Sequence, residues 1–303
     1  MFYTDAVRIA YREEPCKSAL NRVSGMPFGW SLNPYMGCAH RCTFCYVRAF
    51  ELRADRPSDE RYGTSIRVKT NVAEVLRCEL ARPGWAGEHV AIGAATDPYQ
   101  PAEGRYRLTR ACIEALRDAA QDFSIITRGP LIVRDAELLA EAAARADVSV
   151  TFSVPTLDHE VWRTTEPGTS PPRQRLRALK VLVDHGVRAS VGMAPLLPGL
   201  SDRPEQLREV VTAAREAGAC GIWANLLYLK PGTREHFLSC LERDWPELLP
   251  EYEQLYAGRA YLPRDAGAPA RAEVRRLAAA HHVGEQRTRV IKPRKQEQLS
   301  LLP

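Results

Sequence analysis

Short runs of apolar residues alternate with segments of helical spacing along most of this chain. The apolar runs are rich in β-branched and aromatic residues, as strands are, and polar segments with apolar residues three and four positions apart separate them. The predicted strands span residues 30–35, 90–95, 123–127, 148–154, 187–194 and 222–229. The predicted helices span residues 72–80, 109–120, 136–146, 173–184 and 204–217. This alternation predicts βα units around a parallel sheet, a fold of the α/β class.

Six βα units are too few for a closed eight-fold barrel. In parallel α/β folds the active site lies at the carboxyl ends of the strands, so we expect the functional residues in the loops that follow the strands. The pattern divides the chain into an N-terminal extension (1–29), the βα region (30–230), a helical C-terminal cap (231–282) and a flexible basic tail (283–303). Within the cap, helices are predicted at 234–242, 245–256 and 271–280, with a break at 258–269.

The loop after the first strand carries three cysteines. It reads Asn33-Pro34-Tyr35-Met36-Gly37-Cys38-Ala39-His40-Arg41-Cys42-Thr43-Phe44-Cys45-Tyr46, which gives the spacing C-x3-C-x2-C. Thiolates are soft ligands that suit iron–sulfur clusters and zinc. A cubane [4Fe–4S] cluster normally takes four cysteines, so a three-cysteine loop leaves one iron open to another ligand.

Other interpretations of the cysteine loop compete with a cluster. A structural zinc site needs four ligands, and His40 is a candidate fourth, although its place inside the loop strains that geometry. A disulfide framework needs an oxidising compartment, but the first five residues, Met1-Phe2-Tyr3-Thr4-Asp5, contain no charged or apolar segment of a signal peptide. The close spacing of the cysteines speaks against a set of inert buried thiols.

The cysteine spacing, with Phe44 and Tyr46 on either side of the last cysteine, resembles the signature of the radical S-adenosylmethionine (SAM) superfamily. The longer stretch from Asn33 to Tyr46 resembles the DNA-repair-photolyase-like branch, which is related to spore photoproduct lyase, and the resemblance continues to at least Tyr261. It implies a partial (β/α)6 TIM-like barrel that is open on one side. It also implies a [4Fe–4S] cluster whose open iron chelates SAM, and one-electron cleavage of SAM to a 5′-deoxyadenosyl radical that abstracts hydrogen.

The resemblance also implies roles for polar residues at the strand ends. Thr96 and Asp97, in a proline-containing loop after the second strand, would accept from the SAM ammonium group. Arg128, at the end of the third strand, would pair with the SAM carboxylate. Ser153 would bind methionyl or ribose oxygens. The plain alternative is that Asp97-Pro98 only starts a turn.

Three further positions are assigned to the cofactor in the same way. Glu166 opens the run Glu166-Pro167-Gly168-Thr169-Ser170-Pro171, which closely matches the spore photoproduct lyase family, and Arg175 follows in the next helix. Ser170 and Pro171 also suit the start of that helix. Ala194 would place backbone groups beside the adenine.

One departure from the family concerns the hydrogen donor. The spore lyase carries a hydrogen-donating cysteine before the hydroxyl–aspartate pair, where this chain has Ala94-Ala95. Tyr46 and Tyr99 are therefore the candidate catalytic residues for relaying a hydrogen atom, and packing is the alternative role for each.

The net charge of +5 comes entirely from the C-terminal part. From Arg271 onward there are eight basic and three acidic residues, so residues 1–270 sum to zero. Such a tail is either a solvated surface or an arm that attracts nucleic-acid phosphates. At its end, Gln298, Leu299, Leu301 and Leu302 resemble the peptide by which bacterial repair proteins bind the sliding clamp, although short motifs also arise by chance.

The remaining properties place the protein in the cytoplasm. The chain has no run of about 18 apolar residues, so no membrane span is expected, and its other cysteines are scattered. We expect a radical SAM enzyme that acts on damaged or modified nucleic acid, DNA in particular, as in photolyase-like DNA repair, and that takes electrons from a reductant such as flavodoxin or ferredoxin. The alternatives are a radical SAM modifier of a peptide or small molecule, and a zinc-stabilised nucleic-acid-binding module without catalysis.

Overall fold

A computed structural model describes residues 8–284 of the protein. Its centre is a curved sheet of seven strands, ordered β10-β9-β8-β7-β6-β3-β2. The strands are β2 (Leu20–Arg22), β3 (Trp30–Leu32), β6 (Val90–Ile92), β7 (Phe123–Thr127), β8 (Val148–Ser153), β9 (Arg188–Leu196) and β10 (Ile222–Leu226). All neighbours pair in parallel except β2, which runs antiparallel to β3. The six parallel strands confirm the predicted βα architecture.

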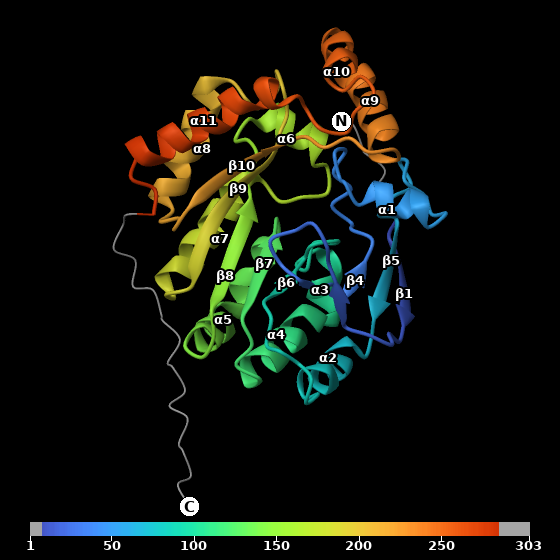
Figure 1. The fold of residues 1–303 in the computed structure, drawn as a ribbon, viewed down its shortest axis with the longest axis vertical. Coiled ribbons are helices and arrows are strands. Elements are labelled where there is room, and N and C mark those ends of the chain that lie inside the picture. The colour runs from blue at the N-terminus through green and yellow to red at the C-terminus, as the bar shows by residue number, and fades with distance from the viewer. Residues whose placement is uncertain (1–7, 285–303) are drawn as a thin grey trace, which may run out of the picture.

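Helices cover the outer face of this sheet (Figure 1). They include α2 (Val72–Leu80), α4 (Leu108–Asp118), α5 (Ala136–Ala143), α7 (Pro172–Asp184) and α8 (Pro204–Glu216), with α3 (Pro101–Tyr106), η1 (Pro130–Asp135) and α6 (His159–Thr165) in the connections. Large apolar residues of the strands, such as Ile125, Val150 and Phe152, point outward and form the main core with the helices. Burying these side chains is the main source of stability for the fold.

The opposite, inner face of the sheet carries mostly small side chains, with Ile126 and Trp223 as larger ones. Ser124 on β7 pairs with Ser149 on β8, and Ile126 pairs with Thr151, which in turn pairs with Ser190 on β9. Closed βα barrels fill this space with bulky residues. Small residues on an open sheet leave room inside the curve of the sheet.

The N-terminal segment contributes one strand to each of two sheets. β1 (Ala10–Glu14) pairs in parallel with β5 (Ser65–Lys69), which pairs antiparallel with β4 (Tyr35–Met36) in a second, three-stranded sheet. β2 extends the main sheet beyond β3. Most of β1 is exposed to solvent, so its sequence lacks a clear apolar alternation.

The segment predicted as a cap separates into two parts. α9 (Thr233–Asp244), η2 (Pro246–Leu248) and α10 (Leu249–Leu255) pack behind the cysteine loop, where Phe237 and Tyr252 share a small core with Cys42 and Phe44. α11 (Arg264–Ala280) instead packs against β10 and α8 and thus supplies the helix of the sixth βα unit. This helix begins earlier than its sequence predicts, with Pro269 inside it.

In the part of the chain that the structure describes, no helix is long and apolar enough to cross a membrane. The predicted clamp peptide, Gln298, Leu299, Leu301 and Leu302, lies outside the described residues.

Candidate active site

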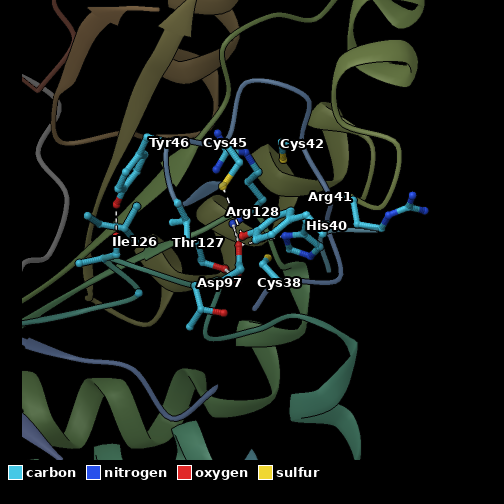
Figure 2. A pocket seen from close by; sticks show the side chains of 15 residues that line it. Cys38, His40, Arg41, Cys42, Cys45, Tyr46, Asp97, Ile126, Thr127 and Arg128 are labelled. Atoms are coloured by element: carbon cyan, nitrogen blue, oxygen red, sulfur yellow. Dashed lines mark hydrogen bonds and ion pairs between the residues drawn. The ribbon is translucent and has the colours of Figure 1, made fainter. Parts of the chain in front are cut away.

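The cysteine loop lies between β4 and α1 (Arg48–Arg53), at the carboxyl end of the main sheet. A pocket forms between this loop and the ends of β6 and β7 (Figure 2). Cys38, Cys42 and Cys45 all line it. Burial raises the pKa of the thiols of Cys42 and Cys45.

The loop that follows β6 holds the cysteine loop by hydrogen bonds. The buried side chain of Gln100 accepts from the Ala39 amide at 2.9 Å and donates to the Gly37 carbonyl at 3.1 Å. The Thr96 hydroxyl donates to the same Gly37 carbonyl at 2.6 Å. The position of Cys38 is therefore set by side chains about sixty residues further along the chain.

The Glu166–Pro171 run supports the other side of the cysteine loop. The Gly168 amide donates to the His40 carbonyl at 3.0 Å, and the Thr43 amide donates to the Thr165 carbonyl at 2.9 Å. A Cβ atom at Gly168 would lie 2.3 Å from the carbonyl oxygen of Ala39, so the backbones approach too closely for any other residue.

A buried arginine lies beneath the cysteine loop. Arg48, only 1% exposed, donates to the carbonyls of Cys42, Arg41, Ser58 and Asp59, and no carboxylate within the described residues pairs with it. Its guanidinium carbon lies 4.6 Å from the ring centre of Tyr62.

Tyr62 connects this arginine to a cysteine. Its ring is buried, and its hydroxyl lies 3.5 Å from the Cys45 sulfur. The hydroxyl can donate a hydrogen bond to the sulfur once that sulfur is a thiolate.

Asp97 lies in the pocket wall, but its oxygens are already engaged. They accept from the Thr127 hydroxyl at 2.7 Å, the Arg128 amide at 2.6 Å and the Tyr99 amide at 2.8 Å, and Oδ2 lies 3.3 Å from Nδ1 of His40. Burial by itself would raise the pKa of Asp97, but His40 and these hydrogen bonds lower it to about 2. Asp97 is thus an anion that fixes the pocket wall.

Arg128, Glu166 and Arg175 form an ion cluster beside the cysteines, in which Glu166 and Arg175 are buried and Arg128 is partly exposed. Glu166 Oε2 lies 3.1 Å from Arg128 Nε and 2.7 Å from Arg175 Nη1, while Oε1, also buried, has no hydrogen-bond partner. Burial lowers the pKa of Arg175, although Glu166 acts in the opposite direction. The guanidinium of Arg128 also donates to the Ala194 carbonyl at 3.0 Å, and the guanidinium of Arg175 donates to the Ser153 carbonyl at 2.9 Å. These contacts join five predicted positions in one network: Arg128, Ser153, Glu166, Arg175 and Ala194.

The two candidate tyrosines lie in different places. Tyr46 lines the pocket, is 40% exposed, and donates its hydroxyl to the Ala94 carbonyl (Figure 2). Tyr99 is in the main core, where its hydroxyl donates to Asp135 at 3.1 Å. The structure therefore brings Tyr46 to the site but does not bring Tyr99 there.

Comparison with known proteins identifies the family to which this pocket belongs. The sequence profile of the radical SAM superfamily matches residues 32–211, which include the cysteine loop and β4 to β9. This chain belongs to the radical SAM superfamily. Enzymes of this superfamily use a [4Fe–4S] cluster and SAM. The cofactors predicted from the cysteine spacing and its resemblance to the superfamily signature are therefore confirmed.

Several relatives of this radical SAM protein are known only as uncharacterized proteins. One from Mycobacterium tuberculosis is 42% identical over 258 residues, which are 84% of this chain and 76% of the relative. One from Methanocaldococcus jannaschii is 23% identical over 171 residues, which are 56% of this chain and 61% of the relative.

Solved structures of spore photoproduct lyase share the fold. A variant of that enzyme with bound AdoMet and a dinucleoside spore photoproduct has a TM-score of 0.67 and 17% identity, over 90% of this chain and 80% of the lyase. A second variant has a TM-score of 0.66 and 16% identity over the same shares. At this level of identity, the likeness concerns the radical SAM fold.

The residues around the cysteine loop fit the radical SAM cluster. Three cysteine thiolates make such a cluster anionic, and Arg48, Arg128 and Arg175 lie around the loop. Within residues 8–284, Arg48 donates hydrogen bonds only to carbonyls and pairs with no carboxylate. Over residues 8–284, no three His, Cys, Asp or Glu side chains converge closely enough to hold a single metal ion. Cubane thiolates each bind a different iron, so a cluster does not require that close convergence.

Sequence reasoning missed residues that act through the cysteine loop. Gln100 and Asn33, which accepts from the Ala95 amide at 2.9 Å, both lie in runs that were recognised as motifs, but nothing in the sequence indicates their partners. Arg48 lies in a helix and Tyr62 in a turn, and both contact the loop. The sequences of that helix and turn contain no motif that would indicate this contact.

Proposed function

We propose that this radical SAM enzyme abstracts hydrogen from a damaged or modified base in nucleic acid, DNA in particular. The observation that carries the proposal is the fold shared with spore photoproduct lyase over 90% of this chain, which extends through the cysteine pocket to the open sheet. That lyase binds a dinucleoside photoproduct in the structure concerned. The small residues on the inner sheet face leave space for a substrate of that kind.

We assign the residues of the pocket to cluster binding and to SAM binding. Cys38, Cys42 and Cys45 would hold the cluster, and Arg128 would face the SAM carboxylate. A cluster held there would supply the one-electron reducing chemistry that cleaves SAM. Among the described residues, Arg128 Nη1 has no acceptor, while Glu166 and the Ala194 carbonyl hold the other two nitrogens in place.

The remaining predicted residues shape and orient the site. Thr96 and Asp97 fix the pocket wall through the bonds described above, so we assign them a positioning role in place of direct contact with the SAM ammonium. Glu166 and Arg175 orient Arg128, and Ser153 lies beside them at the end of β8. Tyr46 is the residue best placed to relay a hydrogen atom, because its ring lines the pocket.

The test is the release of 5′-deoxyadenosine by anaerobically reconstituted, reduced protein. We expect UV-irradiated DNA to raise the release well above that with undamaged DNA, and we expect Cys42→Ala to abolish both. Equal slow release with the two DNA samples would contradict a DNA lesion as substrate while leaving radical SAM chemistry intact.

Two partners complete the proposal. A flavodoxin or ferredoxin would deliver the electron in the cytoplasm, and the sliding clamp would bind Gln298 to Leu302. Deleting residues 298–303 is expected to abolish clamp binding in a pull-down while 5′-deoxyadenosine release stays unchanged. Clamp binding that survives the deletion would remove the clamp from the proposal.

A further inference from the structure

The edge strand β10 presents an aromatic ring on the inner face of the sheet. Trp223 on β10 pairs with Gly192 on β9, and Gly192 pairs with Ser153 on β8. Residues paired across parallel strands point to the same face of a sheet. Trp223, which is 41% exposed, therefore faces the open interior at the level of the active-site end of β8.

The ring of Trp223 is held against the backbone of β9. A Cβ atom at Gly192 would lie 2.8 Å from Cζ2 of Trp223 and 3.2 Å from Cγ2 of Thr151. The φ angle of Gly192 is not in the left-handed region, so its backbone does not require glycine. Instead, the absence of a side chain at Gly192 makes room for the indole ring of Trp223. The ring packs against the β9 backbone and remains partly exposed to solvent. Asn225, the next inward position on β10, is also exposed.

Further aromatic and basic side chains follow β10 along the chain. The rings of Tyr228 and Tyr261 have their centres 4.3 Å apart, and Nζ of Lys230 lies 5.4 Å from the centre of the Tyr228 ring. Tyr261 is 68% exposed, and Lys230 is exposed as well. Aromatic rings beside a cation are the means by which proteins bind single-stranded nucleic acid, because bases stack on the rings and phosphates meet the charge.

We propose that β10 and its continuation form a binding platform for a single-stranded stretch of the nucleic-acid substrate. Trp223 stacks on one base, and the Asn225 amide, which both donates and accepts, meets the edge of a base. Tyr261 and Lys230 contact the neighbouring nucleotide. The inference rests on the proposed function and specifies where the substrate lies.

The position of the platform favours substrate over SAM. The cysteine pocket is lined by the cysteine loop, Tyr62 and the ends of β6 and β7, with no lining residue from β9 or β10. β10 forms the edge of the main sheet, four strands away from β6. A polymer can reach this edge from solvent, and its bases must be unstacked from a partner strand to meet the rings.

The test measures binding of a fluorescent ten-nucleotide single-stranded DNA to the reconstituted protein by anisotropy. Trp223→Ala and, separately, Tyr261→Ala are expected to weaken binding about 5- to 150-fold, the range given by loss of one stacked base. Trp223→Phe should restore most of the affinity. Met26→Ala, which removes an exposed apolar side chain elsewhere, is the control and should bind like the wild type.

Binding of SAM, measured on the same variants, separates the possible outcomes. Unchanged SAM affinity with weakened DNA binding supports the platform. An equal loss of SAM and DNA affinity in Trp223→Ala would overturn it, because the ring would then serve the adenine of SAM. DNA binding by the wild type that survives both alanine variants would overturn the platform alone, while a wild type that binds no DNA would overturn the proposed function as well.

Discussion

Buried charge shapes the site at the scale of single residues. Arg48 is enclosed by carbonyls, and Glu166 lies between two arginines without exposure to solvent. Taking ions out of water costs several kcal/mol each, so such groups persist only where partners compensate them. Such partners fix the positions of the buried side chains. We therefore predict specific effects for variants in which one buried charged side chain is replaced by a neutral one.

Replacing the central carboxylate of the ion cluster should destabilise the fold. Glu166→Gln leaves the buried Arg175 and the partly exposed Arg128 without their anion, and we expect a loss of about 3 kcal/mol in the free energy of unfolding. Urea titration of the two proteins measures it. Glu209→Gln is the matched control, because its ion pair with Arg173 is exposed and contributes under about 1 kcal/mol. Equal losses in the two variants would contradict a structural ion cluster.

Replacing the buried arginine below the cysteine loop should change the cluster potential. Reduction adds negative charge, which a nearby buried cation stabilises, so Arg48→Met is expected to make the midpoint potential more negative. A redox titration followed by electron paramagnetic resonance measures it. Tyr62→Phe should act in the same direction by removing a donor to Cys45.

Arg53→Met provides the comparison for this potential, because Arg53 is an exposed arginine on the same helix as Arg48. Its potential should equal that of the wild type. An unchanged potential in Arg48→Met with full iron content would show that the buried cation does not act on the cluster.

At the scale of elements, the cysteine loop is supported from two sides. The β6 loop contacts it through Gln100 and Thr96, and the Glu166–Pro171 run contacts it through backbone bonds at Gly168. The loop therefore has a fixed shape, although it contains little regular structure of its own. The closest of these contacts is at Gly168, where the methyl group of an alanine would clash with the backbone of the cysteine loop.

Gly168→Ala introduces a Cβ atom 2.3 Å from the Ala39 oxygen and 2.8 Å from the His40 Cα, both backbone atoms. We expect a loss of about 1–3 kcal/mol in stability and less iron bound per protein after reconstitution. Iron analysis and thermal unfolding measure the two effects. Gly84→Ala, where the added Cβ would have no neighbour within 4 Å, should change neither. Full iron content in Gly168→Ala would contradict the supporting role.

The elements also indicate what a sequence can predict. The helix Val72–Leu80 and the strand Phe123–Thr127 were predicted with their observed bounds, since both bury a clear apolar face. β1 and β2 were not predicted, because short strands that are mostly exposed have little apolar pattern. α11 was predicted to begin at Arg271, since Gly267 and Pro269 are poor helix residues, but packing against β10 extends it back to Arg264.

The same limit applies to the site. The three cysteines could be recognised because their spacing is local, and the fold places them as expected around one pocket. Which oxygens of Asp97 are already occupied, and that Tyr99 turns into the core toward Asp135, depend on contacts between distant segments. Contacts between segments that are distant in the sequence cannot be predicted from the spacing of residues along a single chain.

At the scale of the whole molecule, the cofactor pocket and the proposed β10 platform lie on one open sheet. The cofactor pocket lies between the cysteine loop and the ends of the central strands β6 and β7, while β10 forms one edge of the sheet (Figure 1). α11 closes the outer face behind β10 and leaves the inner face open. This arrangement matches an enzyme that holds its cofactors at one side and admits a large substrate from the other.

The most direct test of this account is the lesion content of UV-irradiated DNA after reaction with reduced protein and SAM. Mass spectrometry of the digested DNA should show that a photoproduct or modified base decreases with the wild type and stays constant with Cys42→Ala. Unchanged lesion content in the presence of steady 5′-deoxyadenosine release would contradict repair of DNA as the function.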